Sequence, residues 1–192
     1  MLRLERSDLW SLSEYEVRRV DFRRRIIDLK KRRRVQVGQL LSFIFENRDT
    51  VQFQVQETLR AELVSDPERV QEELDIYNTL LPASDELSAT LFIEVQVTDR
   101  LSAEMARLQG LDRAVYLEIG SERVRGVFEE GRSTEQALST VQYVKFPLTP
   151  SLAEAFRAGK DRLALVVDHP NYRELSVLSP ETRLALAGDL EG

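Results

Sequence analysis

The sequence of 192 residues has no cysteine and a single histidine, His169. The absence of cysteine excludes disulfides, thiolate catalysis, and iron–sulfur or zinc sites held by cysteine ligands of this chain. With one histidine, a metal site with two histidine ligands is excluded as well. The glycine-rich motifs of dinucleotide sites, P-loops and nucleophile elbows do not occur. We therefore predict no bound metal and no cofactor, and the sequence leans away from an enzyme.

Long hydrophobic runs are missing too. No segment approaches the roughly 18 to 20 apolar residues that a membrane span requires. The N-terminal stretch Met1–Arg6 also lacks the basic and then apolar pattern of a signal peptide. At the same time, 42% of the residues are hydrophobic and 31% are charged, a composition typical of a folded protein. The sequence predicts one cytoplasmic domain over residues 1–192, with no membrane contact.

Charge is distributed unevenly along the chain. Residues 1–35 hold 12 Lys or Arg and 6 Asp or Glu, whereas the remainder holds 15 basic and 27 acidic residues. A basic N-terminal segment is thus joined to an acidic body, although the net charge of the whole chain is -6. Lysine is scarce, and the four lysines are Lys30, Lys31, Lys145 and Lys160.

The basic segment is predicted to form one long helix over residues 14–33. Ser13-Glu14-Tyr15-Glu16 has the form of a capping box, and no glycine or proline interrupts the residues that follow. At 100° per residue, the apolar side chains form two stripes on opposite sides, which predicts burial on two faces. The first stripe is Tyr15, Phe22, Ile26 and Leu29, and the second is Val17, Val20 and Ile27. Basic rows run between the stripes, with Arg19, Arg23, Lys30 and Arg34 on one flank and Arg18, Arg25 and Arg32 on the other.

The rest of the chain predicts short helices and strands in alternation. Asp49-Thr50-Val51-Gln52 and Asp66-Pro67 mark two helix starts, and period-two alternation over residues 86–97 predicts a half-buried strand. Further elements are a hairpin over 35–45, a helix over 100–109, a hairpin of 114–119 and 123–128 about Gly120-Ser121, strands over 138–148 and 162–168, a helix over 151–157 and a closing helix from Ser179. We predict an α+β fold: a single domain whose sheet is mainly antiparallel or mixed, with the N-terminal helices packed on one side. The helical layer would span residues 1–82 and the sheet-rich layer residues 83–192.

Polar clusters supply the candidate site. Glu46 and Glu57 flank a dense polar segment, and Glu94 lies in the long predicted strand. The sharper hypothesis places these three carboxylates in one pocket with arginines of the first helix, whereas the simpler one pairs Glu57 with Arg60. The candidate ligand- or partner-binding residues are Arg19, Arg23, Arg24, Lys30, Arg33, Glu46, Asn47, Gln56, Glu57, Arg60, Tyr77 and Glu94.

Two further side chains have alternative interpretations. Asp168-His169 could transfer protons, but a loop histidine bonded to the backbone is the favoured interpretation. Tyr77 is interpreted first as a core residue whose hydroxyl has a partner.

Several of these segments together resemble a bacterial family catalogued as domain of unknown function 3501. The resemblance covers essentially the whole chain, and its most specific part runs from Phe45-Glu46-Asn47-Arg48-Asp49-Thr50 to Gln54-Val55-Gln56-Glu57. It implies no activity and no cofactor. It does imply a redox setting, since genes of this family often lie beside those of rubrerythrin-like proteins and Fe–S oxidoreductases.

Three functions remain open from the sequence. The leading hypothesis is a non-catalytic accessory protein that binds a redox-protein partner or a small anion. The second is an enzyme that works through carboxylates and arginines, with Mg²⁺ bound by Glu46, Glu57 or Glu94. The third, less favoured because the pI is 5.1 and no aromatic residues alternate with the arginines, is nucleic-acid binding through Arg19, Arg23, Lys30 and Arg34. The sequence leaves open whether the chain forms a homo-oligomer.

Overall fold

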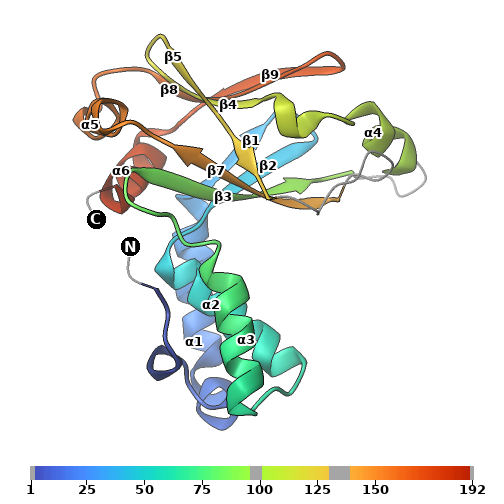
Figure 1. Cartoon of the computed structure of the whole chain (residues 1–192), viewed down its shortest axis with the longest axis vertical. Helices are drawn as coiled ribbons and strands as arrows, with labels where there is room; N and C mark the ends of the chain where they lie inside the picture. The colour runs from blue at the N-terminus through green and yellow to red at the C-terminus, as the bar shows by residue number, and fades with distance from the viewer. Residues whose placement is uncertain (1–2, 96–100, 130–138, 191–192) are drawn as a thin grey trace.

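The computed structural model describes residues 3–95, 101–129 and 139–190 (Figure 1). Two short 3₁₀ turns, Arg6–Asp8 and Leu111–Arg113, accompany the main elements. In chain order these are α1 (Leu12–Lys31), β1 (Arg34–Val37), β2 (Leu41–Phe45), α2 (Arg48–Ala61), α3 (Pro67–Asn78), β3 (Glu86–Ile93), α4 (Leu101–Arg107), β4 (Val115–Ile119), β5 (Glu122–Arg125), β6 (Val127–Phe128), β7 (Val141–Pro147), α5 (Pro150–Ala158), β8 (Leu163–His169), β9 (Tyr172–Val177) and α6 (Pro180–Asp189).

The strands form two sheets with antiparallel pairing throughout the described residues. Sheet A has the order β1-β2-β3-β7-β6, and sheet B has the order β5-β4-β8-β9. The predicted strand over 123–128 is divided, because Gly126 marks the point where the chain passes from sheet B to sheet A. A Cβ atom at Gly126 would lie 2.6 Å from Cγ2 of Val144, so only glycine fits this crossing without a shift.

Alternating apolar side chains from both sheets fill the main core. Phe43 and Phe45 of β2 and Leu117 of β4 are fully buried there, together with Leu165 of β8. Alternation of this kind is what two sheets packed face to face require. The predicted α+β fold with a mainly antiparallel sheet is confirmed.

The three N-terminal helices lie together on one side of the sheets, as predicted (Figure 1). Two apolar clusters separate from the main core lie among these helices. One contains Val55 of α2 and Leu74 of α3, and the other contains Phe22 and Ile26 of α1. The hairpin β1–β2 joins sheet A, although it lies within the segment predicted as the helical layer. That residues 1–192 act as one domain stays a prediction. No helix within the described ranges has the length and apolar character to cross a bilayer.

Helix starts differ from the predicted ones by two residues in α1 and α2. Ser11, not Ser13, caps α1 through a capping box with Glu14. Asn47, not Asp49, caps α2: its side chain accepts a hydrogen bond from the Thr50 N–H, and the Thr50 hydroxyl accepts one from the Asn47 N–H. Both starts offer two capping-type residues two positions apart, Ser11 and Ser13 or Asn47 and Asp49, so a sequence pattern alone does not fix the register.

Two strand predictions were also inaccurate. The strand over 86–97 was predicted to be half-buried, but Ser88 and Thr90 on its polar side are buried at the junction with the helical layer. Residues 96 and 97 lie outside the described residues. Strand β9 was not predicted at all. Only Tyr172 of β9 is buried, so this edge strand has no alternating pattern and depends on pairing with β8.

The predicted burial of α1 on two faces is wrong. Tyr15, Phe22 and Ile26 are buried, as the first stripe predicted. The second stripe is not: Val17 is 85% exposed, Val20 66% and Ile27 49%. In the described structure α1 packs along one side onto α2, and nothing covers its opposite side.

Candidate functional site

The candidate site residues do not share one hollow but divide among separate places. Glu57 contacts α1, Glu46 lies buried where β2 meets α2, and Glu94 lies after the end of β3. Each carboxylate has its own set of partners. Among the residues that the structure describes, no three His, Asp or Glu side chains gather as a metal-binding group. The hypothesis that Glu46, Glu57 and Glu94 converge is therefore not supported by the geometry.

The first place is an ion pair that joins α1 to α2. Arg19 donates two hydrogen bonds to Glu57, from Nε at 2.7 Å and from a terminal nitrogen at 2.8 Å, and the Tyr15 hydroxyl donates a third at 2.7 Å. The bonds from Arg19 hold the pKa of Glu57 below its usual value, and the bond from Tyr15 adds to this effect. Burial raises the pKa of the Tyr15 hydroxyl, and its bond to Glu57 raises it further. The predicted pairing of Glu57 with Arg60 is wrong, since Arg60 instead binds Glu16 of α1.

The pH dependence of stability tests this arrangement. A carboxyl whose pKa is lowered by folding stabilises the fold fully above its ordinary value of 4.5 and loses that contribution as the pH falls through the lower folded value. Glu57→Gln is thus expected to lower the free energy of unfolding at neutral pH, with a difference from wild type that shrinks as the pH falls below 4.5. Urea denaturation at several pH values measures this. Glu72→Gln, on the exposed side of α3, is the matched control and is expected to have little effect; an equal loss at all pH values would contradict the assignment.

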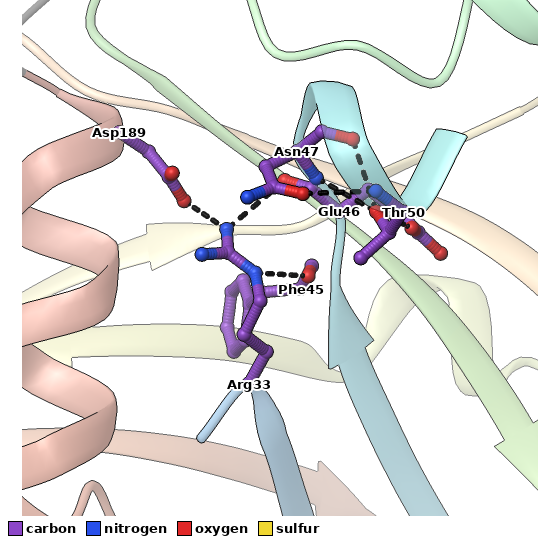
Figure 2. Close-up of polar contacts among 6 residues, drawn as sticks. All are labelled: Arg33, Phe45, Glu46, Asn47, Thr50 and Asp189. Carbon is purple, nitrogen blue, oxygen red and sulfur yellow. Dashed lines mark hydrogen bonds and ion pairs between the residues drawn. The ribbon is translucent and has the colours of Figure 1, made fainter. Parts of the chain in front are cut away.

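The second place is a buried polar cluster around Arg33, which is 2% exposed (Figure 2). Arg33 donates from Nε to the Phe45 carbonyl oxygen at 2.8 Å, and from a terminal nitrogen to the Glu46 carbonyl oxygen at 3.3 Å and to the Asp189 carboxylate. One guanidinium therefore ties the end of β2 and the C-terminal helix α6 to the segment that follows α1. Burial raises the pKa of Asp189, and the Arg33 charge opposes this only in part. The role is structural, because Nε and one terminal nitrogen of the buried Arg33 side chain donate to protein oxygens.

The Glu46 side chain lies in the same region and is 2% exposed. It accepts hydrogen bonds from the hydroxyls of Thr50 in α2 and Thr90 in β3, the latter at 2.5 Å. Because Asn47 and Thr50 cap α2 within the same turn, Glu46 links the helical layer to sheet A. Its two oxygens are occupied by protein hydroxyls, an arrangement that suits a structural joint.

The third place is the end of β3 at the surface. Glu94 accepts a hydrogen bond from the Ser42 hydroxyl at 2.6 Å and lies 3.3 Å from Arg34, and its side chain is 41% exposed. An exposed pair of this kind contributes little to stability.

Gln56, Tyr77 and the neighbouring Asn78 hold the helical layer together. The fully buried Gln56 accepts from the Trp10 N–H at 2.7 Å and donates to the Trp10 carbonyl oxygen at 3.3 Å. Asn78 bonds both backbone groups of Leu4 in the same way. The Tyr77 hydroxyl lies 2.8 Å from the Thr58 hydroxyl, as the interpretation of Tyr77 as a packing residue predicted. These side chains fix the N-terminal segment to α2 and α3.

His169 is buried and bonded to the backbone, which was the favoured interpretation. Its Nδ1 accepts from the Asn171 N–H at 3.2 Å, so its Nε2 carries the proton and donates to the Gln109 carbonyl oxygen at 2.9 Å. Asp168 points elsewhere, towards Arg123 and Arg173. A proton-transfer pair of Asp168 and His169 is therefore excluded.

Comparison with known proteins identifies the family and a similar fold. The model of a family described as "Protein of unknown function (DUF3501)" matches residues 3–190. The chain belongs to the DUF3501 family. The crystal structure of a novel protein of unknown function from Burkholderia pseudomallei K96243 is similar to it, with 34% sequence identity and a TM-score of 0.93 over 98% of this chain and 100% of that chain. No curated protein matches this chain significantly.

The remaining candidates of this DUF3501 protein lie on the exposed side of α1. Of the ten Lys and Arg residues from Tyr15 to Arg34, six make an ion pair. Mutual neutralisation, the simpler interpretation of the basic helix, thus accounts for part of it. Arg23 and Arg32 are exposed and make no ion pair with any described residue, and Lys30 lies over the Phe53 ring at 5.5 Å. Arg24 pairs only with Asp21 on its own helix, at 3.3 Å with both side chains more than 70% exposed.

Sequence reasoning missed Asp189 and the two threonines of the buried cluster. Asp189 is 156 positions from Arg33, and nothing in the sequence links them. Thr90 was passed over because it lies on the side of β3 that alternation predicts to be solvated. Thr50 carried a signal, because it lies three residues after Asn47 in a helix start.

Proposed function

We propose that this DUF3501 protein is a non-catalytic accessory protein that binds a partner protein through the exposed side of α1. The observation that carries the proposal is the exposure of Val17, Val20 and Ile27 among basic side chains. Exposed branched aliphatic side chains that follow one another along one side of a helix leave apolar surface in water, and such surface is a mark of interaction sites. The buried carboxylate of Glu46 and the partly buried one of Glu57 support a structural rather than a catalytic use, since both are bound by protein donors.

The composition of this surface favours a protein over the other ligands considered. A small anion would contact only the cationic groups of α1 and would leave the exposed aliphatic side chains in water. A nucleic-acid backbone would contact the guanidinium groups but would leave the exposed aliphatic side chains unburied. A protein surface with apolar and acidic side chains covers both kinds of group.

We extend the proposal to the identity of the partner. The family resemblance implies neighbouring genes for rubrerythrin-like proteins and Fe–S oxidoreductases, and that association is the support for a redox enzyme as partner. A chain without cysteine supplies no thiolate ligand of its own. The accessory role would then consist of docking onto the redox enzyme.

The scarcity of lysine gives a sharp test of the docking surface. Lys30 and Lys31 lie on or next to α1, whereas Lys145 lies in β7 and Lys160 follows α5, so amine-reactive cross-linking reports on two distinct regions. In cells of the native host, cross-links from Lys30 or Lys31 to one redox enzyme are expected in excess over those from Lys145 or Lys160. Mass spectrometry of the linked peptides identifies the enzyme. Cross-links spread evenly over all four lysines, or to nucleic-acid-binding proteins alone, would refute the proposal.

A further inference from the structure

The exposed side of α1 has the spacing of a coiled-coil contact. Val17, Val20, Arg24, Ile27 and Lys31 follow one another at steps of three and four residues, and all five are exposed. This is the spacing of the a and d positions of a heptad repeat. We call these five residues the α1 seam. Resting on the proposed function, we infer that the α1 seam binds one helix of the partner, with apolar residues opposite Val17, Val20 and Ile27 and acidic residues opposite Arg24 and Lys31.

The seam is separate from the side of α1 that already has a partner. On a helix of 100° per residue, its centre lies about 160° around from the buried residues Tyr15, Phe22 and Ile26. From Val17 to Lys31 it extends about 21 Å, which is four helical turns. A second helix therefore has room to pack along the seam without disturbing the contact with α2.

The charges of the seam call for carboxylates on the partner. Arg24 and Lys31 occupy core positions, and their present partners are Asp21 at 3.3 Å and Asp28 at 2.8 Å on the same helix. These four side chains are all at least 63% exposed, so the pairs are weak and exchange readily. One flank of the seam adds Arg23 and Lys30, whereas the other flank carries Glu14, Asp21 and Asp28, so acidic residues of the partner belong opposite the core cations and the basic flank. Burial of Arg24 and Lys31 in a contact would require opposite charges, which an acidic helix supplies.

A second copy of α1 does not meet this requirement. In a parallel pair, Arg24 would face Arg24 of the second copy and Lys31 would face Lys31. In an antiparallel pair, the row Glu14, Asp21 and Asp28 would face the same row of the second copy. Like charges in these positions oppose association, so the occupant is a helix of different sequence.

A shallow hollow of about 610 Å³ borders the seam and shares Val17 with it. Its floor contains Trp10 and Phe22, over which the guanidinium groups of Arg18 and Arg25 lie at 5.3 and 5.0 Å from the ring centroids. Because both rings lie beneath guanidinium groups and Phe22 is buried, the hollow presents the two arginines to a partner helix and extends the surface beyond the heptad positions.

A synthetic peptide tests the inference directly. The probe is a helical peptide of about three heptads with leucine opposite the aliphatic residues and glutamate only at the positions that face Arg24, Lys31 and the basic flank of Arg23 and Lys30. A second peptide has lysine in place of each glutamate. Isothermal titration with the full chain is expected to show binding of the glutamate peptide that weakens as salt is added, and no binding of the lysine peptide. Equal affinity for both peptides, or no binding of either, would overturn the inference.

Three variants localise the binding. Val20→Glu with Ile27→Glu is expected to weaken binding of the glutamate peptide by about tenfold or more, because both residues are exposed in the free protein and their loss acts on the contact. Leu184→Glu, on α6 and 79% exposed, is the matched control and should leave binding unchanged. Arg24→Glu with Lys31→Glu should reverse the preference towards the lysine peptide. Binding that ignores all seam changes would overturn the inference.

Sedimentation velocity and the cross-linking experiment separate the possible failures. A homodimer that Val20→Glu disrupts would show that the occupant is a second copy, against the inference. Cross-links from Lys30 or Lys31 to a redox enzyme, without binding of the glutamate peptide, would overturn the helical seam and leave the docking function intact. Peptide binding without such cross-links would refute the docking function in the cell but support the seam as a helix-binding surface.

Discussion

Asp189→Ala is expected to lower the free energy of unfolding by about 3–5 kcal/mol, the cost of leaving a buried charge without its partner. Arg33 is 2% exposed and the Asp189 side chain is 9% exposed, so no water replaces the lost carboxylate. Arg33 would keep its hydrogen bonds to the backbone carbonyl oxygens of Phe45 and Glu46, but these two oxygens carry no formal charge. Chemical denaturation of the two proteins measures the difference.

The expected loss does not mean that the ion pair itself is strongly stabilising. Burial raises the pKa of Asp189 in spite of Arg33, so the pair does not recover the full cost of removing its charges from water. A double variant, Arg33→Met with Asp189→Leu, should therefore be more stable than Asp189→Ala alone. It should not reach wild type, because the carbonyl oxygens of Phe45 and Glu46 would then lose their donor.

An exposed pair provides the control for this experiment. Asp75 lies 3.5 Å from Arg3, with side chains 60% and 71% exposed, and Asp75→Ala should cost less than about 1 kcal/mol. A loss for Asp189→Ala no larger than that for Asp75→Ala would show that α6 separates from the segment after α1 in solution.

Local signals in the sequence predicted most of the elements. Asp66 caps α3 by accepting from the N–H groups of Glu68 and Arg69, and Pro67 occupies the first helical position, as the sequence indicated. The turn Gly120-Ser121 is also confirmed, with Gly120 in the left-handed region at φ +62° and Ile119 paired with Glu122. These features are predictable because the residues that decide them are neighbours in the chain.

The errors arise where the deciding partner is distant. β9 forms because β8 offers it an edge, and Ser88 and Thr90 are buried because the helical layer lies over their side of β3. In the candidate site, the favoured pairing of Glu57 with Arg60 is wrong, and the alternative contact with a first-helix arginine holds for Glu57 through Arg19, although the three carboxylates do not converge. No sequence pattern predicted that Arg33 and Glu46 form a structural joint completed by α6 and β3. The sequence shows which residues of a helix are charged, whereas only the tertiary fold determines which partners they contact.

The second apolar stripe of α1 is an error of a different kind. The pattern of Val17, Val20 and Ile27 indicated burial, and the described chain leaves these residues exposed. Exposed apolar side chains gathered on one face of a helix are a known mark of interaction surfaces. The disagreement between the apolar pattern and the fold is therefore the observation on which the proposed docking surface depends.

Thr90→Val is expected to lower the free energy of unfolding by about 1.5–3 kcal/mol, the usual value of a hydrogen bond to a charged group. Valine has nearly the same shape as threonine, so packing around β3 is kept while the 2.5 Å bond to the buried Glu46 carboxylate is lost. Thr50→Val should cost more, since the Thr50 hydroxyl also accepts from the Asn47 N–H at the start of α2. Thr79→Val, at an exposed position after α3 where the hydroxyl bonds only a local carbonyl, is the control.

The double variant Thr50→Val with Thr90→Val decides how Glu46 is held. Two groups that share one carboxylate should show a coupling free energy, because the second loss leaves a buried Glu46 without any hydroxyl donor. The double variant should therefore lose more stability than the two single losses together, and Glu46→Gln in this background should restore part of it by removing the buried charge. Strict additivity, with no rescue by Glu46→Gln, would mean that water or a neighbouring group replaces the hydroxyls and that Glu46 does not join the helical layer to sheet A.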